Sequence, residues 1–197
     1  MFFHSIHGFD SAWKHRFRHI YGKGQIMDIS IRLLKKDELG LIRQIADVVW
    51  PVTFAPILSK EQIAYMMQMI YAPEVMDREY DEGVQFRCVF DGEKPIGYIT
   101  MGPCGSLAGT MKLHKCYLLQ EYQGKGIGSM MLKEAMRLAA EQGYRRLRLN
   151  VNRNNEKAIR AYTRNGFKTV ETVDNPIGGG FFMNDYVMET TLAPARP

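Results

Sequence analysis

The chain has few of the features that mark a disulfide framework, a metal site or a membrane span. Its 197 residues include three cysteines, none of them in a C-x-x-C pair, and this odd number argues against a disulfide framework. A cytoplasmic, reducing location is therefore expected. The spacing of His and Cys side chains fits no metal site, so we expect no metal. No apolar run reaches the roughly 20 residues needed to span a bilayer, so we expect no membrane partner.

Two familiar nucleotide-binding motifs are also missing. A P-loop requires Lys and Ser or Thr after its last glycine, and the dinucleotide fingerprint requires G-x-G-x-x-G. The sequence instead has Q-G-K-G-I-G at residues 123–128, between a β-rich run and a helical pattern. Glycine lets the backbone approach a ligand closely, and the N–H groups at a helix start attract phosphate. The other interpretation is a glycine turn that only redirects the chain.

The positive charge is concentrated near the N-terminus. The formal net charge is +5, and residues 1–26 hold four Lys or Arg against one Asp. Basic charge confined to a tail is a poor indication of nucleic-acid binding, so we expect no nucleic-acid partner. Met27 directly precedes a strand pattern. We therefore interpret residues 1–26 as a disordered extension or a start-site artefact, with a basic targeting or nucleic-acid arm as the alternative.

Residues 27–192 have the length of one domain, followed by a tail at 193–197, and their periodicity predicts an α/β (α+β) layout. The predicted strands cover residues 28–34, 84–90, 96–101, 111–119, 147–151, 168–173 and 181–190. The predicted helices cover residues 37–49, 59–70, 74–80, 127–142 and 156–165. Pro51 is expected to end the first helix, and Asp91-Gly92 predicts a hairpin.

Two motifs resemble those of a known superfamily. The pattern Q-x-x-G-x-G at residues 123–128 resembles the first hallmark of the GNAT superfamily of acyl-CoA-dependent N-acyltransferases. About 30 residues later, N-E-K-A-I-R-A-Y-T-R-N-G-F at residues 155–167 resembles the second, N-x-x-A-x-x-x-Y-x-x-x-G-F. This resemblance implies the GNAT fold, a mixed and mostly antiparallel seven-stranded sheet flanked by helices, whose fourth and fifth strands splay apart. Short segments at 57–59, 113–115 and 179–188 are also similar to bacterial PaiA-type polyamine acetyltransferases.

The resemblance implies acetyl-CoA as the co-substrate. Its pyrophosphate is expected on the backbone of residues 124–129, and its pantetheine arm along the fourth strand. The expected cofactor-binding residues are Cys116, Tyr117, Leu118, Gln123, Gly124, Lys125, Gly126, Ile127, Gly128, Ser129, Asn155, Lys157 and Tyr162. Asn155 has a second interpretation as a helix N-cap, and Lys157 has one as a solvated helix lysine.

The resemblance also assigns Tyr162 as the general acid. It follows Asn155 by two helical turns on the same face, and a phenol can protonate a departing thiolate. The alternative is a core tyrosine. For the general base, some relatives have a glutamate where this chain has Asn150, and others have one where it has His114. Asn150 accepts no proton at useful pH, whereas His114 can act as a base near neutrality. An ordered-water relay is the alternative.

The acceptor is expected opposite the cofactor, between the helical insertion and the last hairpin. The insertion holds aromatic residues and methionines that form either a binding wall or core: Trp50, Phe54, Tyr65, Tyr71, Met66, Met67, Met69 and Met76. The acidic run at 74–82 either attracts an amine or is a solvated helix end. Asp185 either contacts an amine or lies on an edge strand. We expect an N-acetyltransferase for a small amine such as a polyamine, with a protein N-terminal or lysine acetyltransferase and a non-catalytic acyl-CoA-binding or interaction module as alternatives. A homodimer through the C-terminal strands is a further possibility.

Overall fold

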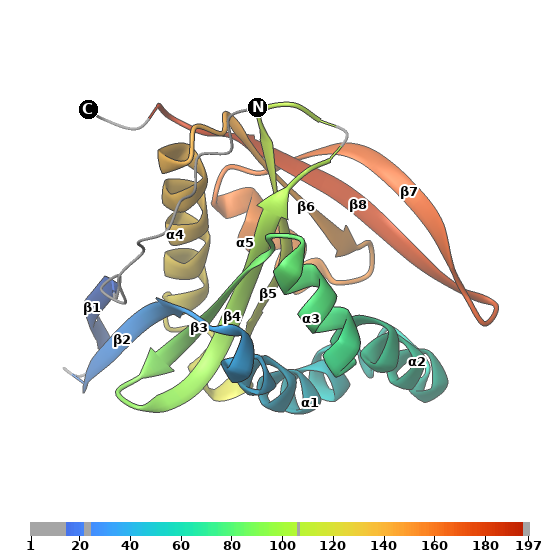
Figure 1. The fold of residues 1–197 in the computed structure, drawn as a ribbon, viewed down its shortest axis with the longest axis horizontal. Coiled ribbons are helices and arrows are strands. Elements are labelled where there is room, and N and C mark those ends of the chain that lie inside the picture. Colours follow the sequence, from blue (N-terminus) through green and yellow to red (C-terminus); the bar gives the residue numbers. More distant parts are fainter. Residues whose placement is uncertain (1–14, 22–24, 106, 195–197) are drawn as a thin grey trace, which may run out of the picture.

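The computed structural model describes residues 15–21, 25–105 and 107–194, which form a mixed β-sheet with helices on both faces (Figure 1). The sheet order is β1-β2-β3-β4-β5-β6-β8-β7. The strands are His15–Tyr21 (β1), Gln25–Leu33 (β2), Gln85–Asp91 (β3), Lys94–Pro103 (β4), Thr110–Leu118 (β5), Arg146–Asn152 (β6), Lys168–Gly178 (β7) and Phe181–Thr191 (β8). The helices are Gly40–Phe54 (α1), Lys60–Tyr71 (α2), Pro73–Asp81 (α3), Ile127–Glu141 (α4) and Glu156–Arg164 (α5), with 3-10 turns at Lys36–Glu38 (η1) and Gln120–Tyr122 (η2).

The predicted architecture is confirmed in seven of these strands. All neighbours in the described sheet are antiparallel except β5 and β6. A parallel pair needs a crossover connection, and α4 supplies it by packing on both strands. None of the described helices is both long and apolar enough to cross a membrane.

The structure differs from the prediction in the N-terminal extension. His15–Tyr21 forms β1, which pairs with β2 over seven residues and extends the sheet at that edge. Without β1, β2 would be the edge strand and would expose unpaired backbone N–H and C=O groups. These groups pair with the segment that forms β1. Residues 1–14 of the predicted extension lie outside the described residues, and the interpretation of Met27 as the natural start stays a prediction.

Helices α1, α2 and α3 cover one face of the sheet, and α4 and α5 cover the other (Figure 1). The apolar side of α4 is buried as its spacing predicted, with Ile127, Met131 and Ala135 fully enclosed. On the opposite face, Ile42, Trp50 and Tyr71 of α1 and α2 are buried in the same continuous core. These two apolar layers fix the sheet between them and leave its strand ends to shape a cleft.

The sequence predicted that Pro51 ends the first helix, and this prediction was wrong. Helix α1 continues through it to Phe54, and the backbone N–H of Ala55 donates to the carbonyl of Pro51 at 3.0 Å. A proline inside a helix costs about 3 kcal/mol. Trp50 and Phe54 lie on either side of it in the helix and are both buried, with ring centroids 4.6 Å apart. Their burial contributes several kcal/mol and offsets the lost hydrogen bond.

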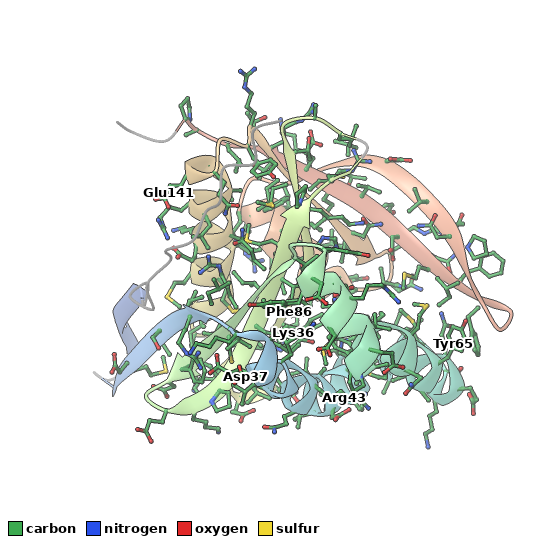
Figure 2. The ribbon with its side chains drawn as sticks, viewed as in Figure 1. Lys36, Asp37, Arg43, Tyr65, Phe86 and Glu141 are labelled. Atoms are coloured by element: carbon green, nitrogen blue, oxygen red, sulfur yellow. The ribbon has the colours of Figure 1, made fainter. Side chains whose placement is uncertain are left out.

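The turn between β7 and β8 is fastened to α2. The hydroxyl of Tyr65 donates to the carbonyl of Ile177 at 2.7 Å, and the side-chain amide of Gln62 donates to the carbonyl of Phe182 at 2.8 Å. Figure 2 shows Tyr65 on the side of α2 that is nearest this turn. Gly178 has φ +92° and lies directly against the Tyr65 hydroxyl. We call this contact the hairpin latch.

The hairpin latch predicts unequal effects for two glycine substitutions. Gly178→Ala and Gly180→Ala both place a Cβ at positive φ, so each should lower the free energy of unfolding by about 1–2 kcal/mol. At Gly178 the new Cβ also overlaps the Tyr65 hydroxyl, whereas at Gly180 it meets open space. Urea denaturation should therefore show a larger loss for Gly178→Ala. The excess should shrink in a Tyr65→Phe background, and an undiminished excess there would contradict this origin.

Candidate active site

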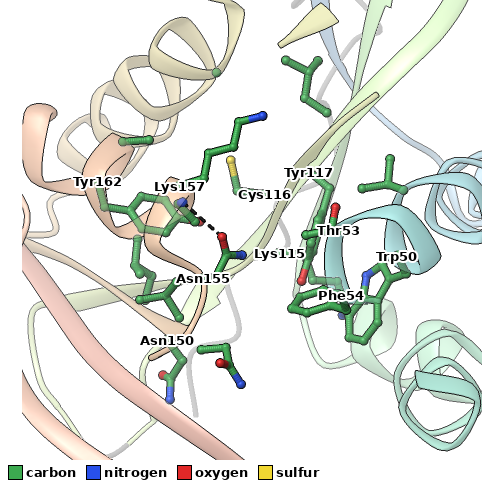
Figure 3. A pocket seen from close by; sticks show the side chains of 18 of the residues that line it. Trp50, Thr53, Phe54, Lys115, Cys116, Tyr117, Asn150, Asn155, Lys157 and Tyr162 are labelled. Carbon is green, nitrogen blue, oxygen red and sulfur yellow. Dashed lines mark hydrogen bonds between the residues drawn. The ribbon is translucent and has the colours of Figure 1, made fainter. Parts of the chain in front are cut away.

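Strands β5 and β6 separate near the middle of the sheet. They pair only from Thr110↔Arg146 to Leu113↔Leu149. Beyond that point β5 stays with β4 to Leu118, and β6 stays with β8 to Asn152. The gap is part of a cleft of about 1090 Å³, lined by α1, α2, β5, β6, β8, the start of α4 and α5. The predicted splay is therefore present, and the cleft passes from one face of the sheet towards the other (Figure 3).

One end of the cleft is formed by the glycine segment and the start of α4. Gly124 has φ +76° and Gly126, the N-cap, has φ +82°, a conformation that favours glycine. The first helical bond runs from the N–H of Met130 to the carbonyl of Gly126, so the N–H groups of residues 127–129 precede it. A Cβ on Gly124 or Gly128 would meet nothing within 4 Å. Open, positively polarised donors of this kind suit a phosphate group.

Gln123 joins the two walls beside this glycine segment. Its Nε2 donates to the carbonyl of Leu118 at 2.9 Å, and its Oε1 accepts from Nζ of Lys157 at 2.6 Å. The end of β5 is thereby tied to the first turn of α5, and the Lys157 ammonium is held at the rim of the cleft. The Lys157 ammonium and the backbone N–H groups at the start of α4 therefore both contribute positive potential to this end of the cleft.

Asn155 and Tyr162 lie on the α5 wall of the cleft (Figure 3). Oδ1 of Asn155 accepts from the N–H of Ala158 at 3.1 Å, so the N-cap role is present. The ring of Tyr162 packs against Phe167 with centroids 5.8 Å apart. Burial, and then the neighbouring Cys116 thiol, raises the pKa of Tyr162 above its usual range. The phenol therefore keeps its proton at physiological pH and is suited to donate it.

The β5 side chains alternate across the cleft. Tyr117 faces α1, with its ring centroid 5.8 Å from that of Trp50 and 6.3 Å from that of Phe54. Cys116 points to the other side, towards Tyr162 (Figure 3). Beyond Leu113 the edge of β5 that faces the gap has no strand partner in the described sheet. The Leu118 carbonyl is already bonded to Gln123, which leaves the preceding peptide groups of that edge for a ligand.

Two residues of the predicted cofactor set do not line the cleft with their side chains. Ile127 is completely buried in the core, so only its backbone N–H is available to a ligand. The Lys125 ammonium lies over the ring of Tyr122, 5.3 Å from its centroid. The remaining predicted residues line the cleft. They are Cys116, Tyr117, Leu118, Gln123, Gly124, Gly126, Gly128, Ser129, Asn155, Lys157 and Tyr162.

His114 lines the cleft where the β4–β5 register shifts. Lys115 pairs with Thr100 and Leu113 with Met101, so His114 is skipped. Crowding by the cleft wall, and then the charges of Lys112 and Lys115, lowers the pKa of His114 to about 4. The imidazole is exposed to the cleft and neutral at pH 7. A base with so low a pKa drives proton abstraction from an amine only weakly.

The α1 side of the cleft is built on a chain of buried hydroxyl and indole groups. Nε1 of Trp50 donates to the Tyr71 oxygen at 2.8 Å, and the hydroxyls of Tyr71 and Tyr98 lie 2.6 Å apart. Trp50, Phe54 and Met66 are each less than 10% exposed and still line the cleft. These residues are therefore part of the core and also line the cleft, and their role as a binding wall stays a prediction. Tyr65, Met67, Met69 and Met76 of the same predicted set are not among the residues that line it.

The acidic run at 74–82 is partly neutralised by ion pairs. Glu79 pairs with Lys115 at 2.5 Å and Asp81 pairs with Lys36 at 2.6 Å. Only Glu79 of this run lines the cleft. The described residues contain no group of three His, Cys, Asp or Glu side chains placed to hold a metal ion.

Asp185, for which the sequence offered two interpretations, lines the cleft. Strand β8 lies between β6 and β7, so it is not the edge strand that one interpretation supposed. Asp185 is 7% exposed, and its Oδ2 accepts from Nδ2 of Asn150 at 3.4 Å. The pairing of β6 with β8 brings it into the cleft, and its contact with an amine stays a prediction.

Comparisons with known proteins agree on this architecture. The model of the acetyltransferase (GNAT) family matches residues 43–167. The spermidine N(1)-acetyltransferase of Thermoplasma acidophilum is 30% identical over 168 residues, which cover 83% of this chain and 97% of that protein. The crystal structure of the PaiA N-acetyltransferase of Thermoplasma acidophilum in complex with coenzyme A is 29% identical with a TM-score of 0.70, covering 84% of this chain and 99% of the other. The ribosomal-protein-S18-alanine N-acetyltransferase of Escherichia coli shares the fold at 15% identity, with a TM-score of 0.64 and coverage of 85% and 96%.

The hydroxyl chain behind the cleft predicts a graded loss of stability. Tyr71→Phe removes the oxygen that serves both Trp50 and Tyr98, and unmet buried polar groups cost about 1–3 kcal/mol. Tyr98→Phe removes one of these two bonds and should cost less. Both variants keep the aromatic ring, so urea denaturation at constant pH compares the hydroxyls alone. A loss for Tyr98→Phe equal to or above that for Tyr71→Phe would contradict the central place of Tyr71.

Proposed function

The chain belongs to the acetyltransferase (GNAT) family, and on that basis we propose that it transfers the acetyl group of acetyl-CoA to a primary amine of a small, polyamine-like molecule. The amine attacks the thioester directly while both substrates occupy the cleft. The observation that carries the proposal is the placement of Tyr162 in the gap between β5 and β6, beside the open donors at the start of α4.

The residues at the glycine end fit acetyl-CoA. The backbone donors of residues 127–129 match a pyrophosphate, and the Lys157 ammonium adds a positive charge at the same rim. The partnerless edge of β5 before Leu118 matches the amides of a pantetheine arm, because those amides can complete the missing strand pairing. A thioester at the end of that arm reaches the neighbourhood of Cys116 and Tyr162.

Tyr162 then has the chemistry of the general acid. Attack by the amine expels a thiolate, and burial raises the pKa of Tyr162, so the phenol is still protonated when the thiolate leaves. The usual pKa of a thiol, about 8.5, lies below that of a free phenol, about 10, so the transfer from Tyr162 to sulfur is uphill by itself. It is completed because the amine nitrogen becomes strongly acidic as the C–N bond forms and returns a proton to Tyr162.

Two observations favour a small acceptor over a protein terminus. The hairpin latch ties α2 to the β7–β8 hairpin, and its residues Gln62 and Phe182 line the cleft, which leaves less room for an extended peptide on that side. The walls there are apolar, formed by Phe54, Ile57, Met66 and Met183. The 30% identical relative is a spermidine acetyltransferase, which supports an aliphatic amine with a methylene backbone.

The proposed role of Tyr162 predicts a loss of turnover without a loss of cofactor binding. Tyr162→Phe keeps the ring and removes the proton donor, so kcat should fall by about 100-fold or more. The dissociation constant of acetyl-CoA should stay within about twofold. Thiol release from acetyl-CoA measures the first quantity across spermidine, spermine, aminoglycosides, amino acids and N-terminal peptides, and calorimetry measures the second.

Gly126→Ala provides the matched control. It strains the N-cap, whose φ is +82°, and should weaken acetyl-CoA binding while leaving the phenol in place. Turnover by Tyr162→Phe equal to wild type would remove the general acid from the mechanism. Wild-type protein that binds acetyl-CoA and acetylates no amine of the panel would count against the proposed acceptor class.

A further inference from the structure

Asp185 is the one acid lining the cleft that has no ion pair with a described residue. The other three, Glu79, Glu121 and Glu156, each pair with a Lys or Arg. Charged side chains normally stay in water or are paired with an opposite charge. Asp185 is only 7% exposed and has no such pair among the described residues. Its one described hydrogen bond, from Asn150, is long at 3.4 Å. A buried carboxylate with so weak a partner is suited to a charged ligand.

Strand pairing places this carboxylate beside two asparagines of β6 that also line the cleft. Asn152 pairs with Asp185 and Asn150 with Val187 across the β6–β8 ladder. Directly paired residues of an antiparallel ladder share a face, as do residues two apart, so Asn150, Asn152 and Asp185 lie together. Burial raises the pKa of Tyr117, and the nearby Tyr162 and Asp185 raise it further. Asp185 and Tyr162 also line the same cleft, from β8 and from α5.

We propose that Asp185 binds the ammonium group of the acceptor and acts as the general base that removes its proton. This inference rests on the proposed acetyltransferase function and deepens it, since it assigns the acceptor subsite. The apolar walls described above hold the carbon chain of the amine, and Asp185 fixes the reacting nitrogen at their sheet end. Asn150, which stands where a glutamate base occurs in some relatives, then orients the carboxylate through its amide.

The electrostatic surroundings support a basic role for Asp185. Burial raises the pKa of this carboxyl above its usual range, while the Asn150 hydrogen bond and the charges of Lys112 on β5 and Arg153 after β6 lower it. Arg153 is itself paired with Asp174 of β7, and this pairing weakens the effect of its positive charge on Asp185. A raised pKa makes a carboxylate a stronger proton acceptor. The pKa of His114, in contrast, is moved away from neutrality.

The protons balance as follows. The amine enters as an ammonium ion, and Asp185 takes one proton, which frees the lone pair on nitrogen. The nitrogen attacks the thioester carbonyl, the C–N bond forms, and the C–S bond breaks. Tyr162 gives its proton to the departing thiolate and is reprotonated by the second proton lost from nitrogen. Asp185 releases its proton to water, so each turnover yields an amide, a free thiol and one proton.

The test compares Asp185→Asn with a matched surface control. Asp185→Asn keeps the shape of the side chain and the acceptor for Asn150 but removes the charge. The control is Glu171→Gln, which removes a carboxylate of β7 that pairs with Arg148 and lies 52% exposed outside the cleft. We expect kcat of Asp185→Asn to fall by about 100-fold or more, the range of general-base catalysis, and that of Glu171→Gln to stay near wild type.

The pH profile distinguishes a base from a structural residue. In wild type, kcat should rise with pH through the pKa of Asp185, because the ionised form is the active one. This acidic limb should vanish in Asp185→Asn, persist in His114→Gln, and persist with partial activity in Asp185→Glu. The substitution should lower activity but not stability. Since burial raises the pKa of Asp185, its ionised form destabilises the fold as pH rises, so Asp185→Asn should unfold at an equal or higher temperature at pH 7.

Amine binding separates the failure of this inference from failure of the proposed function. Calorimetry with the protein saturated by coenzyme A measures the dissociation constant of spermidine without any reaction, and Asp185→Asn should raise it at least about tenfold. If wild type turns over no amine yet shows this difference, the proposed reaction fails and the subsite stands. If wild type is active, and Asp185→Asn retains its kcat, its acidic limb and its amine affinity, the role of Asp185 is overturned.

Discussion

β5 leaves β6 after four paired residues because each strand is held by a different neighbour beyond that point. The pairing of β4 with β5 and that of β6 with β8 continue, and the apolar layers on both faces keep the two halves of the sheet from closing on each other. Every functional feature described above depends on this separation. It exposes the peptide edge of β5, admits Tyr162 from α5, and brings Asp185 into a space that an uninterrupted sheet would have filled with side chains.

The two ends of the cleft differ in electrical character. At one end the start of α4 and the Lys157 ammonium favour anions, and at the other a buried carboxylate favours a cation. Acetyl-CoA is rich in phosphate and the acceptor we propose is an ammonium ion, so in the proposed reaction each reactant is attracted to its own end. The neutral thioester then lies between them. This polarity would let a protein with near-ordinary net charge sort two oppositely charged substrates without a large surface field.

Local patterns in the sequence predicted the parts of the site that lie close together along the chain. The glycine segment, the N-cap Asn155 and Tyr162 fall within about 40 residues, and the family resemblance of their two motifs placed them at the two ends of one helix–strand–helix unit. Residues that meet only through long-range pairing were harder to predict. Asp185 reaches the cleft because β8 inserts between β6 and β7, and no local pattern encodes a sheet order. The predicted helix end at Pro51 was wrong for a different reason. The burial of Trp50 and Phe54 outweighs the local tendency of proline to end a helix. The family resemblance implied Tyr162 as the general acid and His114 as a candidate base, and both roles stay predictions.

The hairpin latch has a consequence for how such a chain diversifies. Both of its hydrogen bonds end on main-chain carbonyls, those of Ile177 and Phe182, and every amino acid carries such a group. Side chains near the β7–β8 turn can therefore be exchanged while these two hydrogen bonds persist, and Phe182 and Met183 are among those that line the cleft. Natural selection can in this way alter the preferred amine by substitutions on the hairpin, while the continuous segment that holds the acyl donor stays untouched.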